Sequence, residues 1–443
     1  MNISFLQVII CLLAGIAAII LLTVRLRLHP FFALLIACFV TGIGMEMSFE
    51  SIIGNIKTGM GDILSKLTLI IVLGTTIGVL LERNGATQVM ANSILNLVGK
   101  KRSSLALSIT GFIVGLPIFC DSGYIVLNGI NKSLVKQTTF TIAQMSISLA
   151  SGLYAVHCLL PPHPGPTAAA ATLDVQFGRI IVYGLIIATP AMLIGHWWAI
   201  RAGKHSKTDI ENETADTDQV SKTRPSVLAA FLPVVVPIAL MALGSMTKLE
   251  SHKGGIFDRI ASIAGEPSVA LAIGVLLALA TGKDRKKNLS HDLAAAVEKA
   301  GGILVIIAAG GAFGAILAAS NIGTHFSQAL DLKTVGIWFP FLLTVILKTA
   351  QGSSTVAIVT ASTILLPLLP AIGLDSENGR LLSVLAMGAG SMMISHTNDA
   401  YFWVIAKFSS IDIRTMLKVH TIASVLMGLI TMIIIYFLSL FML

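Results

Sequence analysis

The chain has 443 residues, of which 55% are hydrophobic and only 12% are charged, and its formal net charge is +8. A soluble domain carries about 25% charged residues, so the composition excludes an ordinary soluble protein. The basic residues gather in short loops, as the positive-inside rule expects, and therefore do not indicate nucleic acid as a partner.

Apolar runs long enough to cross a bilayer recur along the whole chain, which predicts an all-α polytopic membrane protein. We expect the first two spans at residues 5–24 and 30–45, and the first of them lacks the features of a cleaved signal peptide. Two arginines between these spans place that loop in the cytoplasm. Residues 46–62 have mixed charge and are expected to form an outer loop, followed by a third span at 64–81.

The apolar segment 104–129 is interrupted at its centre by Gly115, Pro117, Asp121 and Gly123. Basic residues stand on both sides of this segment, so we expect a re-entrant hairpin that enters and leaves from the cytoplasm. A full but kinked span is the alternative interpretation.

Residues 140–160 are expected to enter the membrane and to stop at the proline-rich stretch 161–166. Residues 180–200 then return to the cytoplasm, where the polar stretch 201–226 is expected to link two halves of the chain. The second half is expected to contain spans at 227–246, 268–281, 301–319 and 421–441, and broken apolar stretches at 338–370 and 381–408.

The chain also contains an internal duplication. A stretch of small residues at 150–152 is followed five residues later by His157, and a similar stretch at 389–391 is followed at the same spacing by His396. Duplicated hydrophobic chains with polar interruptions at matching places are typical of secondary transporters.

We therefore assign residues 1–200 to a first transmembrane repeat and residues 227–443 to a second. Each repeat is expected to hold about five transmembrane helices and one re-entrant hairpin, with discontinuous helices at the centre. An odd number of spans places the start of the second repeat on the opposite side of the membrane from the start of the first, so the repeats are expected to be inverted. The basic cluster at 283–287 supports this orientation.

Four polar interruptions are expected to meet near the middle of the membrane. Broken helices persist there only around a cavity or in the protein interior, and their free N–H groups and positive ends suit an anion. The candidate substrate-binding residues are Ser122, Gly123, His163, Gln351, Gly352, Ser353, Ser354, Thr355 and Asn398. For any single serine or threonine, a hydrogen bond to its own helix is the alternative interpretation.

Scarce ionisable groups inside the apolar segments are candidates for coupling transport to protons. These groups are Asp121, His157, His396 and Asp399. Lys348 is a candidate for balancing the charge of an acid or of the substrate, with extension of its side chain to the membrane interface as the alternative. A lone histidine in an apolar segment is also compatible with a purely structural hydrogen bond.

The sequence contains neither a metal-binding His-Glu-x-x-His motif nor a phosphate-binding glycine loop. We therefore expect no metal and no cofactor, and an ion gradient as the source of energy. The alternatives to a proton-coupled carrier are a sodium-coupled organic anion carrier, a channel, and an intramembrane hydrolase that would use His157, His163 and Asp399.

At these residues the chain resembles the gluconate permease (GntP-type) family of the ion transporter superfamily. The resemblance extends over essentially the whole length and is most specific at residues 29–31, 156–166, 310–313, 351–357 and 395–403. It implies proton symport of a small hydroxylated monocarboxylate, such as gluconate, another sugar acid, a glycerate-like acid or D-serine. It also implies a bacterial inner membrane location, a homodimer and an elevator-like motion.

The sequence departs from the resemblance at one place. Similar proteins commonly have Phe-Phe-Glu-Val in the first hairpin, where this chain has Phe119, Cys120, Asp121 and Ser122. The acid is retained but is one methylene shorter, and Ser122 adds a hydroxyl. This difference leaves the particular substrate open and is compatible with a ligand other than gluconate.

Overall fold

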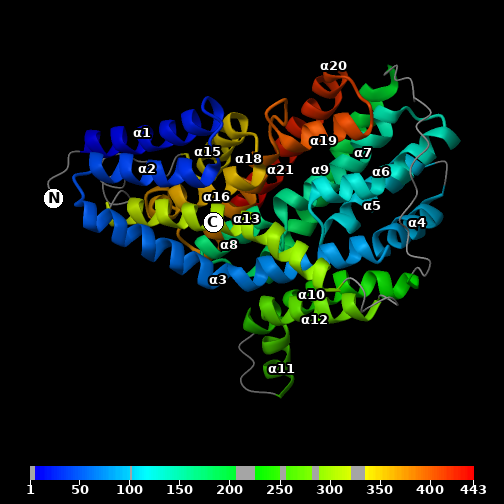
Figure 1. Ribbon diagram of the computed structural model, residues 1–443, viewed down its shortest axis with the longest axis horizontal. Coiled ribbons are helices and arrows are strands. Elements are labelled where there is room, and N and C mark those ends of the chain that lie inside the picture. Colours follow the sequence, from blue (N-terminus) through cyan, green and yellow to red (C-terminus); the bar gives the residue numbers. More distant parts are fainter. Residues whose placement is uncertain (1–4, 100–101, 206–224, 250–255, 282–288, 321–334) are drawn as a thin grey trace.

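The structure is a computed structural model, and it describes residues 5–99, 102–205, 225–249, 256–281, 289–320 and 335–443. Within these residues every regular element is a helix (Figure 1), which confirms the all-α prediction. In the described part of the chain, eight helical segments are long and apolar enough to cross a bilayer, so the protein is a multi-pass membrane protein.

The helices of the first half form a continuous series from the N-terminal end of the described chain. They are α1 (Phe5–Val24), α2 (Pro30–Gly44), α3 (Phe49–Arg83), α4 (Ala86–Val98), α5 (Ser103–Gly115), α6 (Cys120–Gln137), α7 (Ile142–Leu159), α8 (Pro164–Thr172), α9 (Phe177–Ala202) and the 3-10 turn η2 (Gly203–His205).

The helices of the second half follow in a similar order. They are α10 (Val227–Leu249), α11 (Ile256–Ala264), α12 (Pro267–Thr281), α13 (Leu289–Ala319), α15 (Trp338–Gln351), α16 (Ser354–Leu365), η4 (Leu366–Leu368), α17 (Leu369–Ile372), α18 (Glu377–Met392), α19 (Ala400–Phe408), α20 (Ile413–Met416), the π turn η5 (Leu417–Thr421) and α21 (Ile422–Met442).

The prediction of an outer loop at residues 46–62 is wrong, because residues 49–62 form the first part of α3. Ser48 caps this helix by accepting a hydrogen bond from the Ser51 amide at 3.2 Å, and Glu50 lies in the first turn. The helix buries Ile52 and Gly59 on one face while its charged residues remain on the other. An amphipathic helix that continues beyond an apolar span therefore looks like a loop when only hydropathy is considered.

The long helices α3 and α13 cross at Gly59 and Gly311. A Cβ atom added to either glycine would meet the other helix, because the backbones touch there. Further along, Glu82 of α3 lies beside Lys299 of α13, so the two helices are antiparallel. The glycines that the sequence shows near residue 310 thus have a packing role.

Helices α5 and α6 form a pair that folds back on itself. Along α5, Ser108 donates to the Ser148 carbonyl near the start of α7 at 2.8 Å, and Gly115 packs near the end of α7, so the two run parallel. Helix α6 runs the opposite way, because Asn131 near its end donates to Ser146 at 2.8 Å. The broken segment expected at 104–129 is thus a helical hairpin whose tip lies at residues 116–119.

Helix α7 of the first half and helix α18 of the second half also lie antiparallel. The Tyr154 hydroxyl of α7 donates to the Ser391 carbonyl of α18, while the carbonyl of Cys158, further along α7, lies against Gly388, which comes earlier in α18. Helix α9 packs on α21, and the Trp198 indole of α9 donates to the carbonyl of Lys418 in η5, the turn that precedes α21. The linker at 201–226 and the basic cluster at 283–287 lie mostly or wholly outside the described residues.

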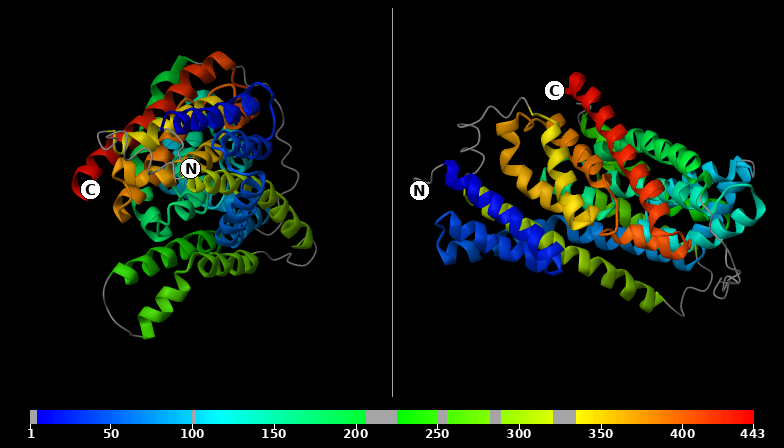
Figure 2. Two further views of the ribbon diagram at one scale, coloured as in Figure 1. Left: turned by 90° about the vertical axis from the view of Figure 1, so that its left-hand side faces the viewer. Right: turned by 90° about the horizontal axis from the view of Figure 1, so that it is seen from above.

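The helices pack as two groups. One contains α1, α2, α3 and α10 to α13, and the other contains α5 to α9 and α15 to α21. In Figures 1 and 2, α10, α11 and α12 project from one side of the molecule. The groups meet where α13 packs on α16, α3 packs on α8 and α10 packs on α9. The polar interruptions of the second group face this boundary.

Candidate functional site

A cavity of about 450 Å³ lies between the tips of the broken helices and one face of α13. Its polar lining comes from five segments that are distant in the sequence. The polar residues and the glycine in this lining are Asp121, Ser122, Tyr154, His157, Lys299, Gln351, Gly352, Ser353, Ser354, Thr355, Asn398, Asp399 and Tyr401. Most of the residues that the sequence nominated therefore share one cavity.

Three helices begin at the wall of this cavity. Helix α6 begins at Cys120, beside Asp121; α16 begins after Ser353, which accepts a hydrogen bond from Val356 N at 3.3 Å. Helix α19 begins after Asp399, whose Oδ1 accepts from Tyr401 N at 3.0 Å. Because the N-terminal end of a helix carries a partial positive charge and unpaired N–H groups, this wall favours an anion.

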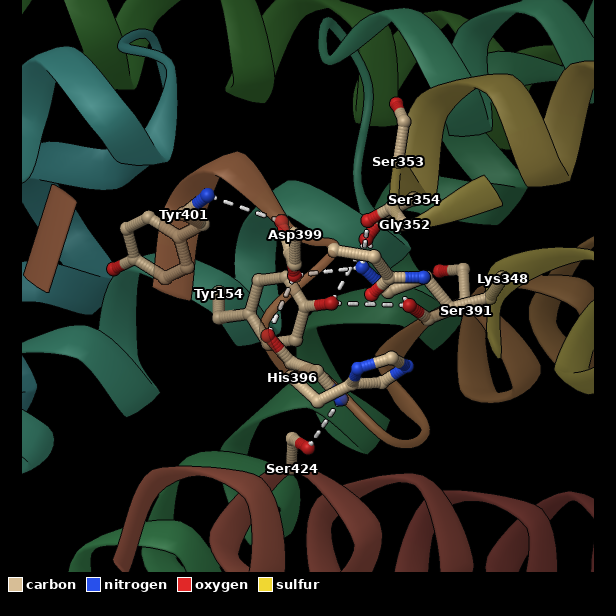
Figure 3. Close-up of polar contacts among 12 residues, drawn as sticks. Tyr154, Lys348, Gly352, Ser353, Ser354, Ser391, His396, Asp399, Tyr401 and Ser424 are labelled. Carbon is tan, nitrogen blue, oxygen red and sulfur yellow. Dashed lines mark hydrogen bonds and ion pairs between the residues drawn. The ribbon is translucent and has the colours of Figure 1, made fainter. Parts of the chain in front are cut away.

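A buried ion pair lies at the centre of the site (Figure 3). The Lys348 Nζ atom is 2.6 Å from Asp399 Oδ2, and their side chains are 0% and 7% exposed. The ammonium also donates to the Gly352 carbonyl, and Ser395 Oγ donates to the same Asp399 oxygen at 2.5 Å. Two buried charges are tolerated when they are paired and hydrogen-bonded in this way. Of the acids that Lys348 was expected to balance, the structure pairs it with Asp399.

A second cation, Lys299, faces the cavity from α13 on the opposite wall. Its Nζ lies 3.4 Å from Ser122 Oγ and 3.7 Å from Glu82 Oε2, and its side chain is 42% exposed. The sequence analysis did not select Lys299, because a lysine near the start of a span is the usual mark of a cytoplasmic end. Among the described residues, no ion pair involves Asp121, which lines the same cavity.

Of the three candidate histidines His157, His163 and His396, only His157 lines the cavity. His157 lines the cavity, and its ring centre is 4.9 Å from that of His163. His163 lies behind this lining, buried, with Nε2 2.8 Å from the Gly115 carbonyl. His396 also lies outside the lining, with Nε2 3.3 Å from the Thr349 carbonyl. The two repeated histidines are therefore not equivalent in their access to the cavity.

The amide side chains of Asn398 and Gln351 differ in whether they already have hydrogen-bond partners. The Asn398 amide nitrogen donates to the carbonyl groups of Thr349 and Ala350 at 2.7 and 3.2 Å. These bonds satisfy carbonyl groups at the C-terminal end of α15. Both polar atoms of the Gln351 amide are buried and have no hydrogen-bond partner among the described residues. Buried amides are rarely left in this state, so Gln351 is available for a polar ligand. Gly123 packs behind the cavity against Leu153.

Several residues of the site carry no signal in the sequence. The Tyr154 hydroxyl bonds to Ser354 Oγ at 2.8 Å, and the Tyr154 ring stacks on Tyr401 with 5.5 Å between centroids. An aromatic residue in an apolar helix looks the same whether it packs in the core or lines a site. All four cysteines are buried and free, and Cys120 lies in the cavity wall.

A helical membrane protein in which interrupted helices meet around an interior polar cavity has the architecture of a secondary transporter. Two solved structures share the fold. The YdaH transporter of Alcanivorax borkumensis has a TM-score of 0.59 and 15% identity, with 85% of this chain and 86% of that chain covered. MtrF of Neisseria gonorrhoeae, from a class of antimetabolite efflux pumps, has a TM-score of 0.54 and 12% identity, with 85% and 82% covered.

The chain belongs to the GntP family of permeases, whose family model matches residues 7–441. A gluconate permease of Pseudomonas aeruginosa is 30% identical over 439 residues, which cover 97% of this chain and 96% of that protein. The L-idonate transporter of the Gnt-II system of Escherichia coli is 29% identical, with 95% and 96% covered. The high-affinity gluconate transporter of Escherichia coli is also 29% identical, with 91% and 93% covered. The resemblance seen in the sequence is thus confirmed.

Proposed function

We propose that this permease imports a small hydroxylated monocarboxylate, of the sugar-acid type, together with protons across a bacterial inner membrane. The observation that carries this proposal is the cavity itself. It is lined by three helix starts, six hydroxyl-bearing side chains and an amide without a hydrogen-bond partner among the described residues. The names of the relatives, which include gluconate and L-idonate transporters, support the same substrate class.

The carboxylate end of the substrate fits the part of the cavity between Lys299 and Ser122. Lys348 is neutralised by Asp399, whereas the nearest acid to Lys299 is 3.7 Å away and partly exposed. Lys299 therefore has more positive charge to offer an incoming anion than Lys348 has in this conformation. A lysine–carboxylate contact of this kind contributes about 1.5–3 kcal/mol when it is partly desolvated.

The hydroxylated end of the substrate fits the opposite side of the cavity. Gln351 presents both a donor and an acceptor there, and Ser353 and Thr355 lie in the adjacent helix start. A polyhydroxy chain satisfies these groups, whereas an apolar acid leaves them unpaired. Sites that hydrogen-bond a substrate hydroxyl reject analogues that lack it, so we expect discrimination against simple fatty acids.

Proton coupling follows from the Lys348–Asp399 pair. A proton on Asp399 removes its negative charge and leaves the Lys348 ammonium unbalanced directly behind Gly352, in the cavity wall. The negative charge of a substrate bound at Lys299 in the same cavity then offsets part of this excess positive charge. Proton and anion therefore favour each other at this site, which is the property that a symporter needs. Asp121, His157 and His396 remain candidates for additional proton-carrying groups.

Alternating access is expected from the arrangement of the two halves, which we propose to be inverted repeats. The antiparallel packing of α3 with α13, and of α7 with α18, supports that proposal. The cavity lies between the two helix groups, so a movement of one group against the other would carry the bound substrate between the two sides. We expect this movement in a homodimer.

The test is uptake of radiolabelled gluconate and L-idonate by proteoliposomes that contain the purified protein. An inward proton gradient should drive accumulation, and a protonophore should abolish it. Replacement of sodium by choline should have no effect. Accumulation that needs sodium and ignores the protonophore would overturn the proton coupling. Recovery of a chemically altered substrate would favour the hydrolase alternative instead.

A further inference from the structure

The carboxylate of Asp399 is connected through Ser395 to a buried histidine on the last long helical segment. Ser395 Oγ lies 2.5 Å from Asp399 Oδ2 and 3.1 Å from His420 Nε2. Ser395 is 0% exposed and His420 is 3% exposed. The three residues form a continuous hydrogen-bonded chain that leads from the cavity wall into the protein interior.

The π turn η5 (Leu417–Thr421) holds the hydrogen-bonded series Asp399–Ser395–His420 in position. It contains His420, and the neighbouring Thr421 donates from its hydroxyl to the Ser395 carbonyl at 2.6 Å. Three residues after Thr421, Ser424 Oγ accepts a hydrogen bond from the Ser395 amide N–H at 3.0 Å. The backbone of Ser395 is therefore held on both sides by one helical segment. Single π turns within helices are frequent at functional sites.

The other groups that face His420 do not compete for its hydrogen bond. The rings of Tyr154, Tyr401 and Phe402 lie within 6.4 Å of its ring centre. The Tyr154 hydroxyl is bonded to Ser354 and to the Ser391 carbonyl, and the Tyr401 hydroxyl donates to the Ala150 carbonyl. The charged groups at this end of the site are Asp399 and Lys348, while Arg414 and Lys418 of the same helical segment are exposed.

The geometry permits two arrangements of the protons. When Asp399 is ionised, the Ser395 hydroxyl donates to it, and the Ser395 oxygen accepts from His420 Nε2–H. When Asp399 is protonated, it donates to Ser395, whose hydroxyl then donates to an unprotonated Nε2. A serine hydroxyl rotates between these arrangements without any movement of heavy atoms. In both arrangements, Asp399, Ser395 and His420 Nε2 each have a hydrogen-bond partner within this series.

We infer that His420 exchanges the coupling proton with Asp399 through the Ser395 hydroxyl. This inference rests on the proton symport proposed above. In the step, Nε2 of the imidazolium gives its proton to Ser395 Oγ as Ser395 gives its own proton to Asp399 Oδ2. The products are a neutral imidazole and a neutral carboxylic acid, and the hydroxyl is regenerated. The Lys348 ammonium is thereby released to favour the substrate anion.

The test compares proton movement with substrate movement in three variants. His420→Gln keeps a polar side chain but carries no titrating proton, and Ser395→Ala interrupts the chain at its centre. His196→Gln is the matched control, because His196 also contacts a serine, Ser148 Oγ at 3.0 Å, but does not line the cavity. Substrate exchange without a gradient reports folding and binding. Accumulation under an imposed proton gradient, and proton uptake in lightly buffered medium, report coupling.

We expect His420→Gln and Ser395→Ala to retain exchange and to lose gradient-driven accumulation together with substrate-linked proton uptake. His196→Gln should behave like the unsubstituted protein. The relay is overturned if Ser395→Ala or His420→Gln accumulates substrate as well as the control does. If the unsubstituted protein itself takes up no proton with substrate, the proposed symport fails as well, and this result is distinct from failure of the relay alone.

Discussion

Lys348 and Asp399, which are 51 residues apart in the chain, form an ion pair of 2.6 Å inside the protein. Lys348 lies near the end of α15, just before the break at Gly352, and Asp399 caps the start of α19. The pair therefore joins two interrupted helices at one wall of the cavity. Any change in charge at one of these residues acts directly on the other.

The first prediction concerns the stability that this pair provides. Lys348→Met should destabilise the protein by about 3–5 kcal/mol, because it leaves the Asp399 carboxylate buried without its partner. Adding Asp399→Asn to that variant should recover much of the loss, since Asn retains the oxygen that caps Tyr401. The measurement is thermal unfolding of the detergent-solubilised variants. A double variant that is less stable than Lys348→Met would contradict the pairing.

The matched control for that experiment is a peripheral ion pair. Arg179 lies 2.7 Å from Glu377, whose side chain is 56% exposed. Exposed pairs contribute about 0–1 kcal/mol, so Glu377→Gln should change the unfolding temperature little. A large effect there would mean that detergent, and not burial, determines the response.

The second prediction assigns the substrate carboxylate to Lys299. Lys299→Gln should raise the apparent KM for uptake by about tenfold or more, which corresponds to loss of a charged hydrogen bond. Lys66→Gln is the control, because Lys66 lines a separate cavity of about 660 Å³ beside Asp174 and Arg380. An equal rise in KM for both variants would point to a general loss of positive potential.

The third prediction concerns the break at Gly352, which has φ +83°. A Cβ atom there would lie 2.7 Å from the Asn398 carbonyl carbon, so Gly352→Ala should push the two interrupted helices apart and abolish uptake. Gly85 has φ +73° but open space around it, so Gly85→Ala tests backbone strain alone. We expect Gly85→Ala to retain uptake with a stability loss of about 1–3 kcal/mol. Full uptake by Gly352→Ala would show that the cavity tolerates a wider break.

The fourth prediction concerns the crossing of α3 and α13. A Cβ atom on Gly311 would lie 2.6 Å from the Ile63 side chain and would also meet the Gly59 backbone. Gly311→Ala should therefore reduce the yield of folded protein, measured by fluorescence-detected size exclusion. Gly302→Ala, on the same helix with nothing within 4 Å, should be tolerated. Equal yields from the two variants would mean that this crossing is loosely packed.

Hydropathy predicted the fold well wherever a helix is both apolar and about as long as a bilayer is thick. The spans expected at 5–24 and 227–246 match α1 and α10 closely, and the Pro-rich stop was expected where α7 ends. The start of α3 and the short helix α4 were missed, because their polar faces carry no hydropathy signal. Their helical structure depends on caps and on neighbours that hydropathy does not include.

The candidate site was predicted in part. Glycine and serine breaks identified the hairpin tips, because a broken helix is conspicuous in an apolar chain. Two acids were possible partners of Lys348, and only the three-dimensional arrangement distinguishes Asp399 from Asp121. Ser395 was noted only as part of the stretch 395–403, without a role of its own, and His420 was not selected. Nothing in a single sequence distinguishes a histidine near the start of the last span from an interfacial one.

The position of Cys120 has a practical consequence for following the transport cycle. This thiol lies in the cavity wall and is 3% exposed, while Cys11, Cys38 and Cys158 are buried away from the cavity. The chain therefore already contains a thiol that can report on access to this cavity. Alkylation of Cys120 by a small maleimide should become faster when the cavity opens and slower when it is filled. Access to the cavity can then be followed without introducing a cysteine by mutation.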